Sequence, residues 1–422
     1  MAEELLRNGA ADFARKVFDD ILVFSKDPVI GISRQGYGPL EQKVHDYVKA
    51  WGREMGLEEK IDRCGNLFLT LPGADRTLPC YMTGSHGDSV PQGGHFDGLA
   101  GVVAGMCAIW WFRKQGITPK RDVTLVVFRL EESSYFGKAY VGSLAMTGQL
   151  KASDIALKHR SGESTLADAV REAGFDPEDM IKTEPSIDLS RIGAFTELHI
   201  EQGPTLDSHK DERVGIVTGI RGNLRHKQVK CIGQTAHSGA VDKQYRHDAL
   251  LATADLLSRM DRHWDEWLAK GRDLVFTTGV LHTAKSSAIS VIPGEVTFTI
   301  DMRGLSMPVL EQFHKLLVAE ADVVAAERGV AFEFDKTLPT QPSVLRADLQ
   351  DKLEDAAKKA GIPVLRLPSG AGHDSAVLSN KGVPVSMIFI ANQDGSHNPY
   401  EKMKMEDFML GAEVLYTAIA AF

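Results

Sequence analysis

Short apolar runs of strand length alternate along this chain with longer stretches of helical character. The runs "NLFLTLPG" (66–73), "CYMTGSH" (80–86) and "DVTLVVFRLEES" (122–133) are typical of strands. Helical stretches cover residues 39–55 and 98–115. Alternation of this kind predicts an α/β layer structure, in which an open sheet carries helices on both faces.

The pattern changes from about residue 214. Two extended runs lie within "GIVTGIRGNLRHKQVKCIG", and a long amphipathic helix, two further strands and a second helix follow. Two strand–helix–strand halves predict a compact four-stranded sheet with two helices, as in ferredoxin-like domains. The chain then returns to α/β character. We therefore predict a discontinuous α/β domain of residues 1–212 and 334–422, with a mixed, mostly parallel sheet, and an inserted ferredoxin-like α+β domain of residues 213–333.

Composition narrows the class of protein and its partners. A chain of 422 residues exceeds the usual size of a single hydrophobic core, which also favours two domains. A formal net charge of −9 without long like-charge blocks argues against nucleic acid or a membrane surface as partner, and favours small molecules. The longest apolar run, 99–112, is too short to cross a bilayer, and the N-terminal stretch lacks the features of a signal peptide. The four cysteines form no CxxC pair, so we expect reduced thiols and a cytoplasmic protein.

Polar residues follow directly after several of the apolar runs. Ligands of doubly wound sheets bind outside the carboxyl ends of the strands, so these positions carry particular weight. Four clusters occur, namely His86, Asp88 and Asp97; Glu131 and Glu132; Glu197, His199 and Glu201; and His397. Each cluster has an ordinary alternative, because a histidine at a strand end is usually a core or capping residue, an Asp-Gly pair a turn, and a Glu-Glu pair a solvated helix start. The coincidence of all four favours a functional site.

The residue types in these clusters indicate a metal site. Imidazole nitrogens and carboxylate oxygens suit zinc, manganese or cobalt. One catalytic ion uses about three protein ligands, so three histidines and at least two carboxylates indicate two adjacent ions, with a shared carboxylate and a shared water of lowered pKa. Glu131 and Glu132 end a predicted strand and would point to opposite sides of it. One of them would bind metal while the other acts as general base.

The motifs resemble those of a known family. H-x-D, G-G-x-x-D-G, the Glu-Glu pair, "ELHIEQG", "GQTAHSG", "SGAGHDS" and "GSHNPYE" occur in the order typical of the dimetal amidohydrolases of the aminoacylase and carboxypeptidase superfamily. More narrowly, the chain resembles the hydantoinase/carbamoylase branch, which includes N-carbamoyl-L-amino-acid hydrolases, β-ureidopropionases and allantoate amidohydrolases. The match runs from about Gln35 to the C-terminus. It implies a catalytic domain interrupted by a lid and dimerisation domain, and a homodimer.

The resemblance implies two divalent ions, with zinc first and manganese, cobalt or nickel as alternatives. Five residues match the metal ligands of the family: His86, Asp97, Glu132, His199 and His397. Asp97 would bridge the ions, whereas His86 and His199 would bind different ions. Glu131 would be the general base. Asp88 would lie outside the ligand shell and orient the imidazole of His86.

Further positions match residues that contact the substrate in this family. Arg303 matches an arginine whose planar donor group binds the substrate carboxylate. His237 matches a histidine that reaches the active site of the neighbouring subunit and stabilises the oxyanion. His373 and Gln202 match other substrate-contacting positions. Without the family context, His237 would be interpreted as a loop residue, Arg303 as a surface residue at a strand end and His373 as a structural turn residue.

The chain departs from the family pattern near the predicted substrate. Ser290 stands where carbamoylases usually have an asparagine that helps Arg303 hold the carboxylate. "EESSYF" replaces E-E-G-[SA]-R-F, so Ser133 and Tyr135 stand in place of a glycine and an arginine. These departures leave the metal chemistry intact and bear on the substrate.

We therefore predict a metal-dependent hydrolase of a linear amide or ureido bond on a small molecule with a free carboxylate, foremost an N-carbamoyl-L-amino acid. The departures make an amidase of N-acyl amino acids the alternative. A catalytically inactive binding relative would have lost a ligand or the base, and all six of these positions are retained. A serine hydrolase is disfavoured because the sequence holds no G-x-S-x-G motif.

Overall fold

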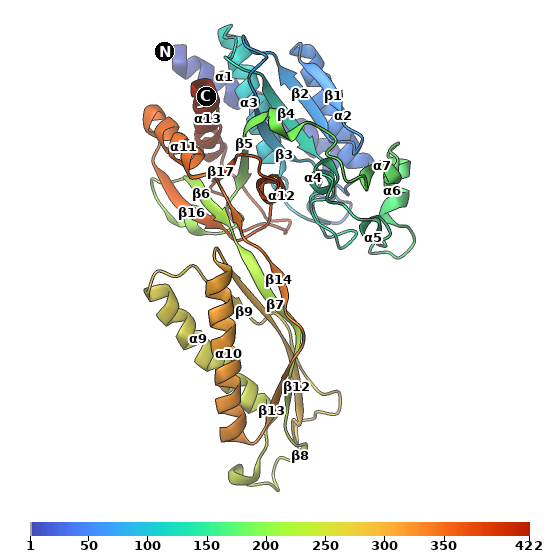
Figure 1. Ribbon diagram of the computed structural model, residues 1–422, viewed down its shortest axis with the longest axis vertical. Helices are drawn as coiled ribbons and strands as arrows, with labels where there is room; N and C mark the ends of the chain where they lie inside the picture. The colour runs from blue at the N-terminus through green and yellow to red at the C-terminus, as the bar shows by residue number, and fades with distance from the viewer. Residues whose placement is uncertain (1) are drawn as a thin grey trace. The chain divides into compact units, whose positions relative to one another are not determined.

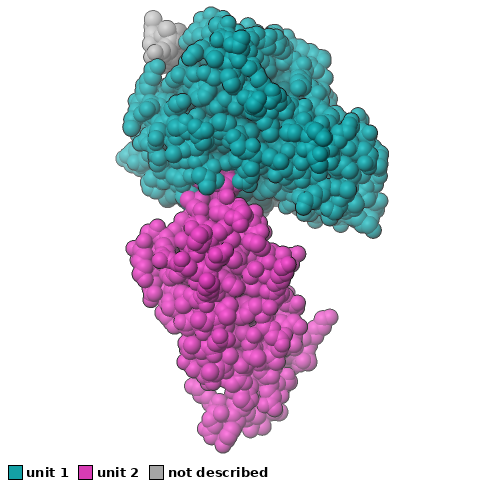
Figure 2. Space-filling view, viewed as in Figure 1, with its two compact units in different colours: residues 1–218, 344–422 teal, residues 219–343 magenta. Residues whose placement is uncertain are grey.

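The computed structural model describes residues 2–422, and the chain divides into two compact units (Figure 2). Unit 1 comprises residues 1–218 and 344–422, and unit 2 comprises residues 219–343. The chain thus leaves unit 1, forms unit 2 and returns. We describe each unit by itself.

Unit 1 is built on a nine-stranded mixed sheet with helices on its faces (Figure 1). The strand order is β1-β2-β4-β3-β5-β17-β6-β15, and β16 pairs with β6. The central strands β4, β3, β5 and β17 run parallel, whereas antiparallel pairs join β1 to β2, β2 to β4 and β17 to β6. The strands are β1 (Glu58–Ile61), β2 (Leu67–Leu71), β3 (Cys80–His86), β4 (Val123–Phe128), β5 (Ile192–Ile200), β6 (Val214–Ile220), β15 (Ser343–Val344), β16 (Val364–Ser369) and β17 (Val385–Ile390).

Helix α3 (Leu99–Gln115) is the central helix of unit 1. It packs against β3 and against α1 and α13, so apolar residues surround most of it instead of forming one stripe. It ends at Gly116, which has a φ of 66°. The other helices are α1 (Ala2–Ser25), α2 (Pro39–Glu54), α4 (Val141–Met146), α5 (Ala152–Ile155), α6 (Leu166–Glu172), α7 (Pro177–Met180), α8 (Thr205–Ser208), α11 (Ala347–Ala360), α12 (Asp374–Asn380) and α13 (Met405–Ala421), with a 3₁₀ turn at Leu189–Arg191.

Unit 2 is an antiparallel sheet with two long helices packed on it. The order is β10-β12-β7-β13, and two short strands extend it, because β9 pairs with β12 and β14 pairs with β7. Buried residues of β7 such as Val229 and Cys231 join residues of both helices in one hydrophobic core. The elements are β7 (Gly222–Ile232), β8 (Ala236–His237), a 3₁₀ turn (Lys243–Tyr245), α9 (Ala249–Ala269), β9 (Val275–Thr277), β10 (Leu281–Thr283), β11 (Val291–Ile292), β12 (Glu295–Gly304), α10 (Met307–Arg328), β13 (Ala331–Phe334) and β14 (Leu338–Thr340).

The bounds of unit 2 differ from the predicted inserted segment, 213–333. At the N-terminal side, β6 pairs with β17 and so belongs mostly to the sheet of unit 1. At the C-terminal side, β14 pairs with β7 and so extends the sheet of unit 2. Strand pairing therefore moves both bounds toward the C-terminus. Among residues 2–422, no helix has both the length and the apolar character that a bilayer crossing needs.

Candidate metal centre

The predicted ligands of unit 1 lie beside the ends of its parallel central strands. His86 is the last residue of β3, and His199 is near the end of the neighbouring strand β5. Asp97 lies just before α3, which packs on β3. His397 lies in the loop after β17. Because parallel strands end at the same edge of a sheet, residues far apart in the sequence meet there.

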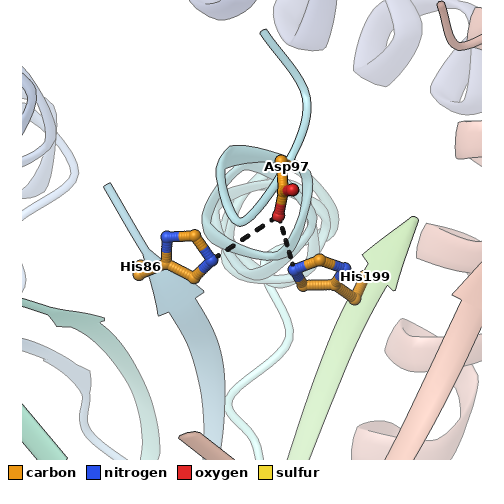
Figure 3. Close-up of side chains that lie close together, drawn as sticks. All are labelled: His86, Asp97 and His199. Carbon is orange, nitrogen blue, oxygen red and sulfur yellow. Dashed lines mark ion pairs between the residues drawn. The ribbon is translucent and has the colours of Figure 1, made fainter. Parts of the chain in front are cut away.

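Asp97 faces two imidazoles (Figure 3). Its Oδ1 lies 3.2 Å from Nε2 of His199 and 3.7 Å from Nε2 of His86. All three side chains are buried, and their ligand atoms lie within 4.8 Å of one another. Gly98 has a φ of 67°, and a Cβ there would lie 2.3 Å from Cε1 of His86, so only glycine lets the backbone pass so close to the imidazole. This donor set suits one divalent ion.

A second group of potential ligands shares Asp97. Nε2 of His397 lies 3.3 Å from Asp97 Oδ2 and 3.3 Å from Glu132 Oε1. Asp97 therefore presents one carboxylate oxygen to each group, which is the geometry expected of a carboxylate shared by two ions. The grouping differs from the pairing implied by the family resemblance, because His86 and His199 face the same oxygen. His397 is the histidine of the other group.

Glu131 and Glu132 lie beyond the strand that was predicted to carry them. Strand β4 ends at Phe128, and the chain then turns through Leu130, whose φ is 42°. The prediction that Glu131 and Glu132 point apart because they alternate along a strand is therefore wrong in its reason. The turn itself separates them, since Glu132 reaches His397 while Oε2 of Glu131 lies 3.8 Å from Nε2 of His86.

Asp88 contacts both His86 and this turn. Its Oδ1 lies 3.2 Å from Nδ1 of His86, the ring nitrogen opposite the one that faces Asp97. The same carboxylate accepts the backbone N–H groups of Glu131 and Glu132, each at 3.0 Å. Asp88 therefore has the position expected of a residue that orients a metal-binding imidazole.

The electrostatics of the cluster favour a bound cation. Burial raises the pKa of Glu131 well above its usual range, and Glu132 adds to the rise although His86 opposes it. Burial disfavours ionised Asp97, yet His199 and His397 outweigh it and hold the pKa of that carboxyl well below its usual range. Asp97 and Glu132 in turn raise the pKa of His397 to about 11. The buried carboxylates thus attract positive charge, and a divalent ion would supply it while releasing protons from the imidazoles.

Gln202 and His373, which match substrate-contacting positions, both lie against the metal-ligand candidates. Nε2 of Gln202 donates to Oδ2 of Asp97 at 2.8 Å. The ring of His373 lies 4.6 Å from the ring of His199, centre to centre, and its Nε2 lies 2.9 Å from Oγ of Ser369. Burial lowers the pKa of His373 well below its usual range, and His199 adds to the effect, which favours the neutral form of the imidazole.

A third group of potential ligands combines Glu197, His199 and His373. Glu197 is fully buried, and its oxygens accept hydrogen bonds from the hydroxyls of Ser85 and Ser375, at 2.7 and 2.6 Å. The backbone N–H of Ser375 also donates to it, at 3.1 Å. Because its oxygens already accept three hydrogen bonds, Glu197 is better suited to holding β5 and α12 together than to binding an ion.

His237, Ser290 and Arg303 lie in unit 2. His237 is exposed at the end of β8, which pairs with β11, and the N–H of Ser238 donates to the carbonyl of Ser290 at 2.9 Å. His237 and Ser290 are therefore neighbours. Arg303 lies on β12, where its Nε and Nη2 donate to Oδ2 of Asp301 at 3.1 and 2.9 Å. Both donors reach the same oxygen, so the Arg303 guanidinium pairs with a carboxylate of its own unit.

The two departures after the Glu-Glu pair have different surroundings. Tyr135 is buried in a hydrophobic cluster, and its ring stacks on that of His159 at 5.8 Å. Ser133 is exposed. Tyr135 therefore serves packing beside the site, whereas the family's arginine at this position would carry a charge.

Sequence reasoning missed two residues that contact Asp97. Oγ of Ser396 lies 2.6 Å from Asp97 Oδ2 and 2.6 Å from Glu401 Oε2. Burial raises the pKa of Glu401 to about 7, and the charge of Asp97 adds to the rise. Both residues stand in "GSHNPYE", where the histidine alone was given a role. The sequence signal that could have revealed Glu401 is its carboxylate, which ends the motif that already carried the predicted ligand His397.

A model of "Peptidase family M20/M25/M40" matches residues 82–421. The chain belongs to this family. It is 34% identical over 395 residues to the N-carbamoyl-L-amino acid amidohydrolase of Geobacillus stearothermophilus, covering 93% of this chain and 94% of the relative. It is 31% identical over 395 residues to the allantoate amidohydrolase of Escherichia coli (strain K12), covering 93% of each. A crystal structure of an amidase of the hydantoinase/carbamoylase family from Burkholderia multivorans has a TM-score of 0.88 and 29% identity, with 97% of each chain covered.

The predicted resemblance is thereby confirmed for the family, for the mixed sheet with flanking helices and for the class of enzyme. Hydrolases of family M20 depend on metal ions, and this M20-family chain carries groups of residues that fit them. The donors are imidazole and carboxylate, without a thiolate, as in catalytic and not structural zinc sites.

Proposed function

We propose that this M20-family hydrolase cleaves the linear C–N bond of an N-carbamoyl-L-amino acid or a related ureido acid. The observation that carries the proposal is the arrangement around Asp97, where two groups of ligands share one carboxylate beside Glu131. The choice of substrate is supported by the relatives, which are named as amidohydrolases of N-carbamoyl-L-amino acids and of allantoate.

The ions would be held by His86 and His199 on one side of Asp97, and by Glu132 and His397 on the other. Zinc fits this donor set, and manganese, cobalt and nickel are alternatives. Bound there, divalent ions supply a Lewis acid for the scissile carbonyl and lower the pKa of a water molecule. The protons of the reaction would be moved by side chains of the protein.

Glu131 is the general base in this proposal. It takes a proton from the attacking water as the water oxygen bonds to the carbonyl carbon, and it delivers that proton to the leaving nitrogen as the C–N bond breaks. Burial raises its pKa, which matches a carboxyl that must both accept and release a proton. With a ureido substrate, the amino acid leaves and the remaining carbamate collapses to ammonia and carbon dioxide.

The residues of unit 2 would complete substrate binding. Arg303 is proposed to bind the substrate carboxylate, because a planar guanidinium with several N–H donors suits a carboxylate. His237, with Ser290 beside it, is proposed to stabilise the oxyanion in the partner subunit of a homodimer. Gln202 and His373 would contact the substrate next to the ions. We also propose a cytoplasmic location, which the four free cysteines support.

A second candidate is an amidase of N-acyl amino acids. Two observations favour it. Ser290 lacks the two amide N–H donors of the family's asparagine, which the resemblance implies would help Arg303 hold the substrate carboxylate. Tyr135 packs into a hydrophobic cluster where the family's arginine would bring a charge, so the surroundings of the metal site are less polar.

Substrate turnover separates the two candidates. The purified protein would be stripped of metal, reloaded with zinc or manganese, and incubated with N-carbamoyl-L-amino acids and matching N-acyl amino acids. Ammonia released together with free amino acid would support the ureido hydrolase. Amino acid released only from N-acyl compounds, without ammonia, would establish the amidase instead. Glu131→Gln, prepared in parallel, reports any contaminating hydrolase.

A further inference from the structure

Glu401 joins two loops that each carry a candidate metal ligand. One loop precedes α3 and carries Asp97, and the other follows β17 and carries His397. Glu401 belongs to the second loop and is 7% exposed. Its carboxylate accepts backbone N–H groups of the first loop. Residues of two loops are thus joined by one buried side chain.

The contacts with the first loop are to its backbone. Oε1 of Glu401 accepts the N–H of Phe96 at 2.8 Å and the N–H of Asp97 at 3.2 Å. A Cβ at Gly94 would lie 2.1 Å from Cδ of Glu401, so the carboxylate rests directly on the backbone of Gly94. Oε1 of Glu401 therefore holds the backbone of the Asp97 loop through two N–H groups.

The contact with the side chain of Asp97 runs through Ser396. The Ser396 hydroxyl lies 2.6 Å from Glu401 Oε2 and 2.6 Å from Asp97 Oδ2. Ser396 is the residue before His397. The loop that holds these residues is closed by a pair of backbone hydrogen bonds between Gln393 and Lys402, at 2.8 and 3.1 Å. A movement of Asp97 would therefore be transmitted to the loop of His397, and the reverse.

From this geometry we infer that Glu401 is a positioning residue of the metal centre. It holds the loops of Asp97 and His397 in one arrangement, so that both ligands are preorganised for divalent ions. The inference rests on the proposed metal site and adds to it a residue outside the ligand set. Partners of this kind typically change metal affinity about 10- to 100-fold when they are removed.

The test compares zinc binding by full-length wild type and four variants. Glu401→Ala removes the carboxylate, whereas Glu401→Gln keeps an oxygen for the two backbone N–H groups and offers its own N–H to Ser396. Ser396→Ala removes only the hydroxyl between the carboxylates. Lys402→Gln is the matched control, because it breaks an exposed ion pair with Asp394 in the same loop. Zinc affinity is measured by competition with a chromophoric chelator, and the melting temperature of each metal-free protein is recorded.

We expect Glu401→Ala to weaken zinc binding about 10- to 100-fold, and Glu401→Gln and Lys402→Gln to stay within about threefold of wild type. A purely structural role would lower the melting temperature of metal-free Glu401→Ala and leave zinc affinity unchanged, which overturns the inference. If Glu401→Ala does not fold, Ser396→Ala decides, because unchanged zinc affinity there also overturns it. A wild-type protein that binds no zinc would refute the proposed metal site itself, which is a distinct outcome.

Discussion

Replacing Arg129 by methionine should destabilise unit 1 strongly, because Arg129 belongs to an ion pair sealed from water. Its Nη1 lies 2.8 Å from Oε2 of Glu41, and the two side chains are 2% and 0% exposed. The guanidinium also donates to the carbonyl of Gly65 at 3.1 Å and to Oε1 of Gln42 at 2.5 Å. Methionine fills much of the same space without charge or donors. Glu41 would then keep a buried charge without its cation.

The fall in melting temperature can be worked out from the loss of this buried ion pair. Removing one partner of a buried ion pair costs about 3–5 kcal/mol. Unit 1 has about 300 residues, and at about 2.1 cal/mol/K per residue its unfolding entropy is about 0.6 kcal/mol/K. Dividing the first quantity by the second gives a fall in Tm of about 5–8 °C.

The stability that Arg129→Met loses should also depend on pH. Burial raises the pKa of Glu41, and the Arg129 guanidinium opposes the rise. Without Arg129 the folded-state pKa lies still further above the unfolded value, so the folded variant binds a proton more tightly than the unfolded chain does. That proton stabilises the variant at acidic pH, and the stabilisation is lost as the pH rises through the raised pKa. Arg129→Met should therefore lose less stability at about pH 5 than at about pH 8.

The assay is thermal unfolding of metal-free protein, since bound metal would add its own stabilisation. Arg76→Met is the control, because Arg76 pairs with Glu58 at 2.7 Å in an ion pair that is about half exposed. Surface pairs contribute about 0–1 kcal/mol, so the control should melt within about 2 °C of wild type. Adding Glu41→Gln to Arg129→Met removes the orphaned charge and should recover part of the loss. Arg129→Met melting no lower than Arg76→Met would refute the reasoning.

Two further predictions concern catalysis. Glu131→Gln should lower kcat by at least about 10²-fold while zinc content stays near wild type, because Glu131 is in none of the ligand groups. Steady-state kinetics and metal analysis of the purified variant check this. Substantial remaining turnover would remove Glu131 from the role of base. His237→Ala should lower kcat far more than zinc affinity, and mixing it with Arg303→Ala should restore some activity if the two residues serve an active site from different subunits. Failure of every mixing ratio to restore activity would count against that arrangement.

Much of the secondary structure could be predicted from local pattern. The runs at 80–86 and 98–115 correspond closely to β3 and α3, because both are long apolar segments with a glycine or polar residue at the end. The run at 122–133 was too long, since β4 ends at Phe128. Apolar pattern alone does not reveal that Leu130 takes a positive φ, because leucine rarely does so. The carboxylate of Glu41, which accepts the N–H of Leu130 at 2.8 Å, comes from a distant helix.

The ligand candidates could be predicted because parallel strands bring their ends together, but their grouping around Asp97 could not. The prediction placed His86 and His199 on different ions, whereas in the structure both face Oδ1 of Asp97. That grouping depends on the orientation of the Asp97 carboxylate just before α3. Strand order and residue spacing do not specify such an orientation, and hydrogen bonds from Gln202 and Ser396 to Oδ2 help to set it.

Acidic residues near the centre have two distinct tasks, which the sequence does not distinguish. Asp97 and Glu132 present oxygens to the ligand nitrogens. Asp88 and Glu401 instead accept backbone N–H groups of the turns on which Glu132 and Asp97 lie. A buried carboxylate suits this second task because it can accept several N–H groups that would otherwise lose their hydrogen bonds. Counting acidic residues at strand ends therefore overstates the number of candidate metal ligands, and the pattern of hydrogen bonds to backbone amides separates these candidates from the residues that hold their loops in place.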